Sequence, residues 1–190
     1  MGRDKALEPF LGKAMIERVI ERVSPLADEV LVTTNRPEAY TYLGLPLYPD
    51  RVPGRGALGG LYTALSAAHQ PLAAVVACDM PFVSADLLSF ERDLVLEKRY
   101  DAVIPLSEGF AEPFHAVYRP ATCLPAIHAA LQAEKWRVDS WFGDVSLHLI
   151  SADEAAVYDP YHLAFRNVNT PEELAQAEKI AGRLAAGLEP

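Results

Sequence analysis

The chain has 190 residues and a formal net charge of −9, from 17 lysines and arginines against 26 aspartates and glutamates. With 51% hydrophobic and 23% charged residues, it has the composition of a soluble globular protein. Its length suits one domain with a full hydrophobic core. The acidic balance argues against nucleic acid as the main partner, because phosphate backbones require clustered lysine and arginine. It does not exclude a small anionic ligand.

The cysteine and hydropathy patterns predict a cytoplasmic protein with no membrane partner. Cys78 and Cys123 are too far apart for a metal or redox motif, which favours a reducing compartment. The best apolar run, 72–78, is much shorter than the ~20 residues that a membrane-spanning helix needs. The N-terminus also lacks the apolar stretch of a signal peptide.

Helical and strand patterns alternate along the chain. Apolar residues at helical spacing, or opening signals such as a capping serine, predict helices over 13–23, 37–43, 58–69, 121–134 and from positions 84 and 171 onwards. Apolar runs predict strands at 29–34, 73–77, 101–105 and 145–150, with a further strand at 113–118. This pattern predicts an α/β fold, a three-layer sandwich with a mostly parallel, Rossmann-like sheet. No repeat or linker interrupts it, so we expect a single domain over residues 1–190.

The residues that follow the predicted strands are the first candidates for a site, because ligands of such sheets bind beyond the carboxyl ends of the strands. They are Thr33, near the end of the predicted strand 29–34, Asp50, which ends another short strand, Asp79, and the loop after Pro105. A carboxylate at a strand end can coordinate a hard cation such as Mg²⁺. Asp79 could instead cap the next helix, although Ser84 is better placed to do so. The two carboxylates favour Mg²⁺-assisted phosphate chemistry over general acid–base catalysis.

A glycine-rich segment, 54–59, has the spacing G-x-G-x-x-G and precedes a predicted helix. This spacing occurs in dinucleotide-binding proteins, but there a buried strand comes immediately before it. Here the preceding residues 47–53 include prolines and charged side chains, so that interpretation is weak. Free amides at a helix N-terminus still favour an anion, and Arg51 and Arg55 add positive charge. A plain surface loop is the alternative.

No nucleophile is evident. The histidines show no metal-binding spacing, and neither Ser66 nor Ser84 has the flanking residues of a nucleophile elbow. Cys78 adjoins Asp79, and a neighbouring carboxylate raises the pKa of a thiol rather than lowering it. We therefore expect no covalent intermediate on the protein.

Six segments, in order along the chain, resemble the molybdenum cofactor guanylyltransferases (the MobA family). Residues 1–6 resemble the end of the signature L-A-G-G-x-S-x-R-M-G-x-D-K, and the others resemble G-K-P-L-I-E, D-x-x-P-G-x-G-P-L-A-G, A-C-D-M-P-F, E-P-L-x-A-x-Y and N-V-N-T-P-E-D-L. In this chain the last five of these segments occupy, in the same order, residues 12–17, 50–60, 77–82, 112–118 and 167–174. Together they cover nearly the whole chain, so the resemblance is strong.

This resemblance implies a nucleotidyltransferase fold and an Mg²⁺-dependent enzyme. The enzyme would transfer GMP from GTP to molybdenum–molybdopterin, giving the guanine dinucleotide cofactor and pyrophosphate. By position in the motifs, Lys5 would contact the nucleotide phosphates and Asp50 would hold the guanosine. Gly56 would let the nucleotide approach the backbone. Asp79 would bind Mg²⁺ and nucleotide, and Asn169 would assist with the metal. Lys5 and Asp79 would be the catalytic residues.

The resemblance also has alternatives. A molybdopterin cytidylyltransferase, or a non-catalytic protein that binds molybdopterin or a nucleotide, would share most of these motifs. The signature's first strand and phosphate loop, L-A-G-G-x-S-x-R, fall before Met1. Either the protein extends upstream or the chain is a degenerate relative. The implied partners are GTP, molybdopterin and, transiently, the proteins that deliver molybdopterin or mature molybdoenzymes.

Overall fold

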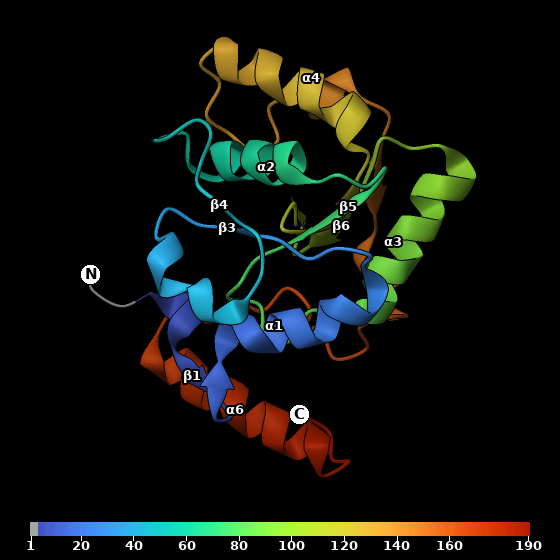
Figure 1. Cartoon of the computed structure of the whole chain (residues 1–190). Helices are drawn as coiled ribbons and strands as arrows, with labels where there is room; N and C mark the ends of the chain where they lie inside the picture. Colours follow the sequence, from blue (N-terminus) through green and yellow to red (C-terminus); the bar gives the residue numbers. More distant parts are fainter. Residues whose placement is uncertain (1–3) are drawn as a thin grey trace.

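The computed structural model describes residues 4–190 and centres on a five-stranded sheet (Figure 1). Its strands are β5 (Ala73–Val76), β6 (Ala102–Ser107), β7 (Phe110–Ala111), β8 (His115–Tyr118) and β9 (Leu147–Ile150). β8 lies between β5 and β6 and is antiparallel to both, whereas β9 pairs with β6 in parallel. β5, β6 and β9 therefore run in one direction, as expected for a mostly parallel sheet, whereas β7 and β8 run in the opposite direction.

Two smaller sheets accompany the central one. β3 (Val32–Thr33) and β4 (Leu47–Tyr48) pair in parallel, and β1 (Pro9–Phe10) and β2 (Lys13–Ala14) form an antiparallel hairpin. The helices are α1 (Met15–Val23), α2 (Gly56–Ala67), α3 (Ala85–Lys98), α4 (Pro120–Gln132), α5 (Ala152–Ala156) and α6 (Pro171–Ala185). Short 3₁₀ turns occupy Lys5–Leu7, Ser24–Leu26, Pro37–Ala39, Thr41–Leu43 and Phe142–Asp144. No helix among residues 4–190 is both long and apolar enough to cross a bilayer.

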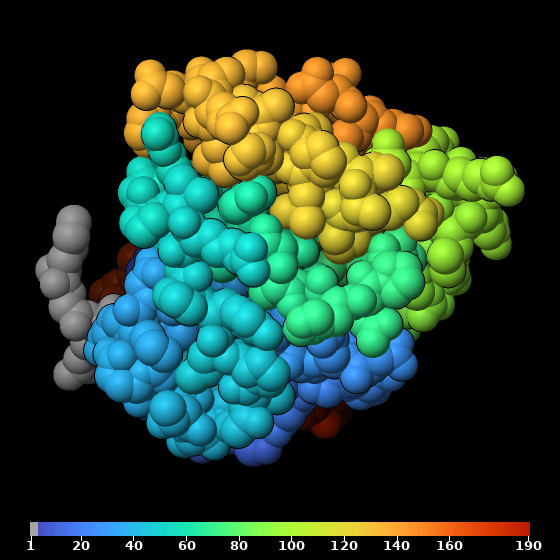
Figure 2. Space-filling model, turned by 45° about the horizontal axis from the view of Figure 1, so that its top comes forward, coloured from blue at the N-terminus to red at the C-terminus, as the bar shows by residue number. Residues whose placement is uncertain are grey.

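Helices cover both faces of the central sheet, which gives the three expected layers. Successive side chains of β6 point to opposite faces of the sheet. Ile104 therefore packs in a core with α2 and α4, and Val103 packs in a second core with α1 and α3. Figure 1 shows α2 and α4 on one side of β5 and β6, with α1 on the other. In the space-filling view, the yellow surface of α4 lies directly against the green surface of α2 (Figure 2).

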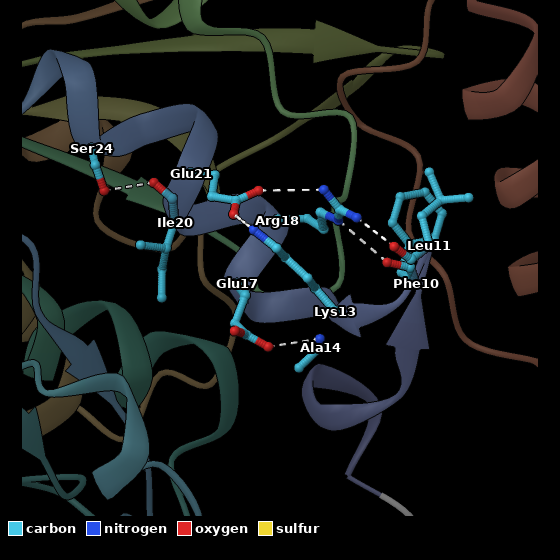
Figure 3. A network of polar contacts seen from close by, with 9 residues as sticks. All are labelled: Phe10, Leu11, Lys13, Ala14, Glu17, Arg18, Ile20, Glu21 and Ser24. Atoms are coloured by element: carbon cyan, nitrogen blue, oxygen red, sulfur yellow. Dashed lines mark hydrogen bonds and ion pairs between the residues drawn. The ribbon is translucent and has the colours of Figure 1, made fainter. Parts of the chain in front are cut away.

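The β1–β2 hairpin is fixed to α1 by polar contacts that surround its turn (Figure 3). The Arg18 guanidinium donates to the carbonyl oxygens of Phe10, at 3.3 Å, and Leu11. The backbone N–H of Ala14 donates to Glu17 Oε2 at 2.8 Å, which supplies one of the bonds that a helix N-terminus leaves unmade. These contacts hold the segment that leads from Lys5 into α1.

An apolar groove of about 750 Å³ separates the β3–β4 pair from the central sheet. Residues 29–33 line one side and residues 70–78 the other, with part of α1 along the groove. Within the described residues, β3 pairs only with β4, and β5 pairs only with β8. The two sides are linked at one end, where Glu29 Oε1 accepts the backbone N–H of His69 at 2.7 Å.

Candidate functional site

Three of the predicted site residues meet beyond the carboxyl end of β5. Lys5 Nζ donates to Asn169 Oδ1 at 2.6 Å. The backbone N–H of Val168 donates to the carbonyl oxygen of Asp79 at 2.9 Å, which attaches the Asn169 segment to the Asp79 segment. The Lys5 charge also acts on the Asp79 carboxylate. The structure thus brings together a cation, a carboxylate and an amide from three distant parts of the chain.

Asp79 lies in a partly desolvated position. Burial raises the pKa of its carboxyl group, and the opposing effects of a backbone hydrogen bond and of the Lys5 charge are smaller. Removal of water favours the uncharged form of a carboxylic acid, whereas a nearby cation favours the charged form. A further cation placed beside Asp79 would therefore favour the charged form of its carboxyl group.

The donor atoms at this position suit a hard cation. Asp79 offers carboxylate oxygens and Asn169 an amide oxygen, and Mg²⁺ binds one or two such protein oxygens together with substrate phosphates and water. Within residues 4–190, no three His, Cys, Asp or Glu side chains gather as a metal cluster. Asp79 and Asn169 offer oxygen donors that suit a metal which also binds the phosphate oxygens of a ligand.

Asp50 occupies a separate position, after β4. Its carboxylate accepts from Asn35 Nδ2 at 2.7 Å, and its backbone N–H donates to Asn35 Oδ1 at 2.9 Å. No hydrogen bond or ion pair within the described residues joins Asp50 to Lys5, Asp79 or Asn169. Sequence analysis missed Asn35, although it follows β3 closely, and the rule about strand ends that selected Thr33 could have found it.

The glycine-rich loop ahead of α2 has a shape that requires its glycines. Gly56, the first residue of α2, has φ +54°, a conformation that glycine adopts at little cost. A Cβ on Gly59 would lie 3.0 Å from the carbonyl oxygen of Val52 and 2.9 Å from Arg55 Cβ. Buried Thr63 holds the same loop by accepting the backbone N–H of Arg51 at 3.0 Å.

Arg55, one of the two predicted anion-binding arginines, is held by an aromatic ring. Its guanidinium lies 4.4 Å from the ring centroid of Trp136, which follows α4. A cation over an aromatic face is attracted by the electron density of the ring. This contact ties the loop before α2 to the end of α4, and nothing local in the sequence indicates the pairing.

The surroundings of Cys78 agree with the prediction that it is not an activated nucleophile. Its thiol is at the surface, but partial desolvation by the surrounding chain, followed by the charge of neighbouring Asp79, raises the pKa of the thiol to about 11. A thiol with such a pKa is almost entirely protonated at neutral pH, so it is a poor nucleophile.

Comparison with known proteins identifies the family of this chain. Residues 1–144 match the family described as a MobA-like NTP transferase domain. The chain belongs to the MobA-like NTP transferase family. The resemblance in its six motifs is thereby confirmed as a family relationship, although Met1, Gly2 and Arg3, which open the first motif, lie outside the described residues.

Curated relatives extend the match over nearly the whole chain. A probable molybdenum cofactor guanylyltransferase of Natranaerobius thermophilus is 32% identical over 187 residues, covering 96% of this chain and 91% of the relative. The relative of that name from Pelotomaculum thermopropionicum is 33% identical over 187 residues, covering 98% and 90%.

Solved structures confirm the fold. Molybdopterin-guanine dinucleotide biosynthesis protein A from Archaeoglobus fulgidus superposes with a TM-score of 0.81 at 26% identity, covering 95% of this chain and 92% of that one. A 2-C-methyl-D-erythritol 4-phosphate cytidylyltransferase from Thermus thermophilus superposes with a TM-score of 0.68 at 18% identity, covering 94% of both. At 18% identity, the similarity to this cytidylyltransferase shows the fold alone. The predicted Rossmann-like nucleotidyltransferase fold is confirmed.

Proposed function

We propose that the protein transfers GMP from GTP to molybdenum–molybdopterin, producing the guanine dinucleotide form of the cofactor and pyrophosphate. The names of the relatives, which align over nearly the full chain, support this activity. The single structural observation that carries it is the meeting of Lys5 and Asn169 beside Asp79. That cluster combines a cation with oxygen donors, as phosphate chemistry requires.

Lys5 would bind the phosphates of GTP. In the reaction, a phosphate oxygen of molybdopterin forms a bond to the α-phosphorus, and the bond from that phosphorus to the leaving pyrophosphate breaks. The attacking phosphate is already ionised at neutral pH, so no protein base is needed. Catalysis then consists of aligning two anions and stabilising the charge that develops between them. The ammonium group of Lys5 provides one such charge.

Asp79 and Asn169 would hold Mg²⁺. When bound, the ion would neutralise charge on the α-phosphate and on the leaving pyrophosphate. The partial burial of Asp79 supports this assignment, because burial raises the pKa of its carboxyl group and a neighbouring cation counters that rise. Asn169 shares its Oδ1 with Lys5, which leaves a second lone pair on the amide oxygen.

Asp50 and the loop at Gly56 would bind the guanosine end of GTP. Asn35 fixes Asp50 through both a side-chain and a backbone hydrogen bond, so the carboxylate is oriented before a ligand arrives. Gly56 has no side chain at the start of α2, so a ligand can approach its backbone, and its φ of +54° suits glycine. In this proposal, Asp50 and Lys5 would contact different parts of the bound nucleotide.

We further propose that the whole chain is one nucleotidyltransferase domain, and that a strand of the family signature belongs in the groove between β3 and β5. Two observations support this placement: among residues 4–190, the edges of β3 and β5 that face the groove have no strand partner, and the groove has an apolar lining. A variant that carries the L-A-G-G-x-S-x-R segment and its strand ahead of Met1 is expected to melt at a higher temperature than residues 1–190. An unchanged melting temperature would contradict the placement.

We also propose a cytoplasmic setting, with transient contacts to the proteins that deliver molybdopterin or accept the product. The cysteine pattern supports that setting: Cys78 and Cys123 are both free thiols, as is usual in a reducing compartment.

The activity is tested by mixing the protein with molybdenum–molybdopterin, MgCl₂ and either GTP or CTP. Pyrophosphate release and the mass of the dinucleotide product are measured. Release with GTP, and a guanine dinucleotide product, are expected. A preference for CTP would make the protein a cytidylyltransferase instead. Binding of molybdopterin without pyrophosphate release from either nucleotide would overturn the enzymatic proposal in favour of a binding protein.

A further inference from the structure

A buried polar pair lies behind the candidate site. Glu91, on α3, and His115, on β8, both have fully buried side chains. His115 Nδ1 is 3.2 Å from Glu91 Oε1, and Glu91 Oε2 has no hydrogen-bond partner. Polar groups are costly to bury, even when they are partly satisfied. Neither residue belongs to the catalytic and binding set above, so the pair calls for a physical explanation.

The hydrogen bonds determine which nitrogen of His115 carries the proton. The backbone N–H of Ser84 donates to Nε2 at 3.2 Å, so Nε2 is the acceptor. The proton is then on Nδ1, which donates to Glu91 Oε1. Burial lowers the pKa of His115 to about 4, so the imidazole is neutral at physiological pH and can both donate and accept. Glu91 thus orients the ring so that Nε2 faces Ser84.

Ser84 ends the loop that begins at Asp79. It caps the N-terminus of α3, and its Oγ accepts the N–H of Leu87 at 3.2 Å and donates to the carbonyl oxygen of Tyr158 at 3.0 Å. At the other end of the loop, the carbonyl of Asp79 accepts the N–H of Val168. His115 therefore anchors the far end of a short, mostly buried loop whose first residue is Asp79.

His115 also contacts the other segments that form the site. It lies directly opposite Val76 in the β5–β8 register. Val76 is three positions before Asp79 in the sequence. The ring of Phe165 meets it edge-on, with the centroids 5.2 Å apart, and Phe165 belongs to the segment that leads to Asn169. A single imidazole thus joins α3, the strand before Asp79 and the approach to Asn169.

We propose that His115, oriented by Glu91, is a positioning residue that sets the place of the Asp79 carboxylate through its hydrogen bond from Ser84. The inference rests on the proposed function, in which Asp79 binds metal and nucleotide. Its geometric part, that His115 holds the loop from Asp79 to Ser84, does not depend on that function.

Two substitutions of His115 separate the two hydrogen bonds. In His115→Gln, the amide oxygen can take the place of Nε2 and accept from Ser84, but the bond to Glu91 is lost. In His115→Asn, the amide N–H can take the place of Nδ1 and donate to Glu91, but the bond from Ser84 is lost. Each variant loses one buried hydrogen bond, so a comparable loss of thermal stability is expected from both.

The proposal predicts that only His115→Asn impairs the site. Its kcat should fall about 10–100-fold, as small misplacements of reacting groups do, and the half-saturating Mg²⁺ concentration should rise. His115→Gln should keep a turnover and an Mg²⁺ dependence much closer to those of the parent. Equal losses in both variants would overturn the proposal and assign the pair a merely structural role. Val95→Ala, a cavity variant on the same helix as Glu91, controls for destabilisation and should leave Mg²⁺ dependence unchanged.

Hydrogen–deuterium exchange tests the geometric part without any turnover. Amides of residues 79–87 should exchange faster in His115→Asn than in the parent, and His115→Gln should protect them. The same exchange in all three proteins would overturn the positioning role. Absence of GMP transfer by the parent, combined with the expected exchange pattern, would instead count against the proposed function alone.

Discussion

Lys5 Nζ donates to Asn169 Oδ1 at 2.6 Å, although 164 positions separate the two residues along the chain. Asn169 is itself fixed, because its backbone N–H donates to Glu173 Oε2 at 2.6 Å within the capping box of α6. Two segments that lie far apart in the sequence therefore meet at the candidate site. The hydrogen bond gives the flexible Lys5 side chain a defined direction beside Asp79.

Replacing Lys5 by methionine should reduce turnover about 100–1000-fold, the usual effect of removing one donor that stabilises developing negative charge. The melting temperature should change little, since an exposed polar contact contributes about 1 kcal/mol or less. Pyrophosphate release and circular dichroism measure the two effects. Lys13→Met is the matched control, because Lys13 is also exposed and pairs with Glu21 on the hairpin side of α1. Similar losses of turnover in both variants would mean that Lys5 has no specific role.

Asp79→Asn should abolish Mg²⁺-dependent transfer and leave the fold intact. The substitution removes a charge that would hold the metal. Burial already raises the pKa of this carboxyl group, so its loss should not lower the thermal stability. Transfer is followed by pyrophosphate release over a range of MgCl₂ concentrations. Asp93→Asn, on the exposed side of α3, should behave like the parent. Normal turnover of Asp79→Asn would show that the metal ligand lies elsewhere.

Local patterns were sufficient to predict Asp79 and Asp50 as candidates, because the end of an apolar strand is visible in a short stretch of sequence. The capping role of Ser84 was predictable for the same reason. Lys5 and Asn169 were named only through the family resemblance. Their meeting depends on how the first and last segments pack, and no local signal encodes it.

Other features were beyond prediction because they depend on tertiary packing. β8 lies between β5 and β6 and is antiparallel to both, whereas the sequence showed only an apolar strand after a turn. The stacking of Arg55 on Trp136 joins two segments with no common pattern. The Glu91–His115 pair could not be predicted from the sequence, because charged residues are rarely fully buried.

Two adjacent glycines of α2 should respond in opposite ways to alanine. Gly59→Ala places a Cβ 3.0 Å from the carbonyl oxygen of Val52, so the loop that leads to Gly56 must shift, and the KM for GTP should rise. Gly60→Ala meets no atom within 4 Å and should stabilise the helix by about 0.5–1 kcal/mol. Steady-state kinetics and urea unfolding distinguish the two. An unchanged KM for Gly59→Ala would show that the close approach at Gly59 does not shape the nucleotide site.

The free energy of unfolding should fall as the pH drops from about 6.5 to 4, in part because of His115. Burial lowers the pKa of this residue from 6.5 to about 4. Within that interval the unfolded chain binds a proton at His115 and the folded protein does not, so acid favours unfolding. A shift of about 2.5 pH units corresponds to at most about 3 kcal/mol.

His115→Gln isolates this contribution, because glutamine does not titrate. Urea unfolding at pH 7 and pH 5 should show a smaller loss of stability on acidification in His115→Gln than in the parent. The contribution of Glu91 to the free energy of unfolding changes with pH in the opposite direction. Burial raises the pKa of its carboxyl group, so this contribution is fully present below about pH 4.5 and is lost as the pH rises. Glu91→Gln should therefore gain stability relative to the parent at pH 7. Parallel pH profiles for the parent and His115→Gln would mean that His115 is not held neutral in the folded protein.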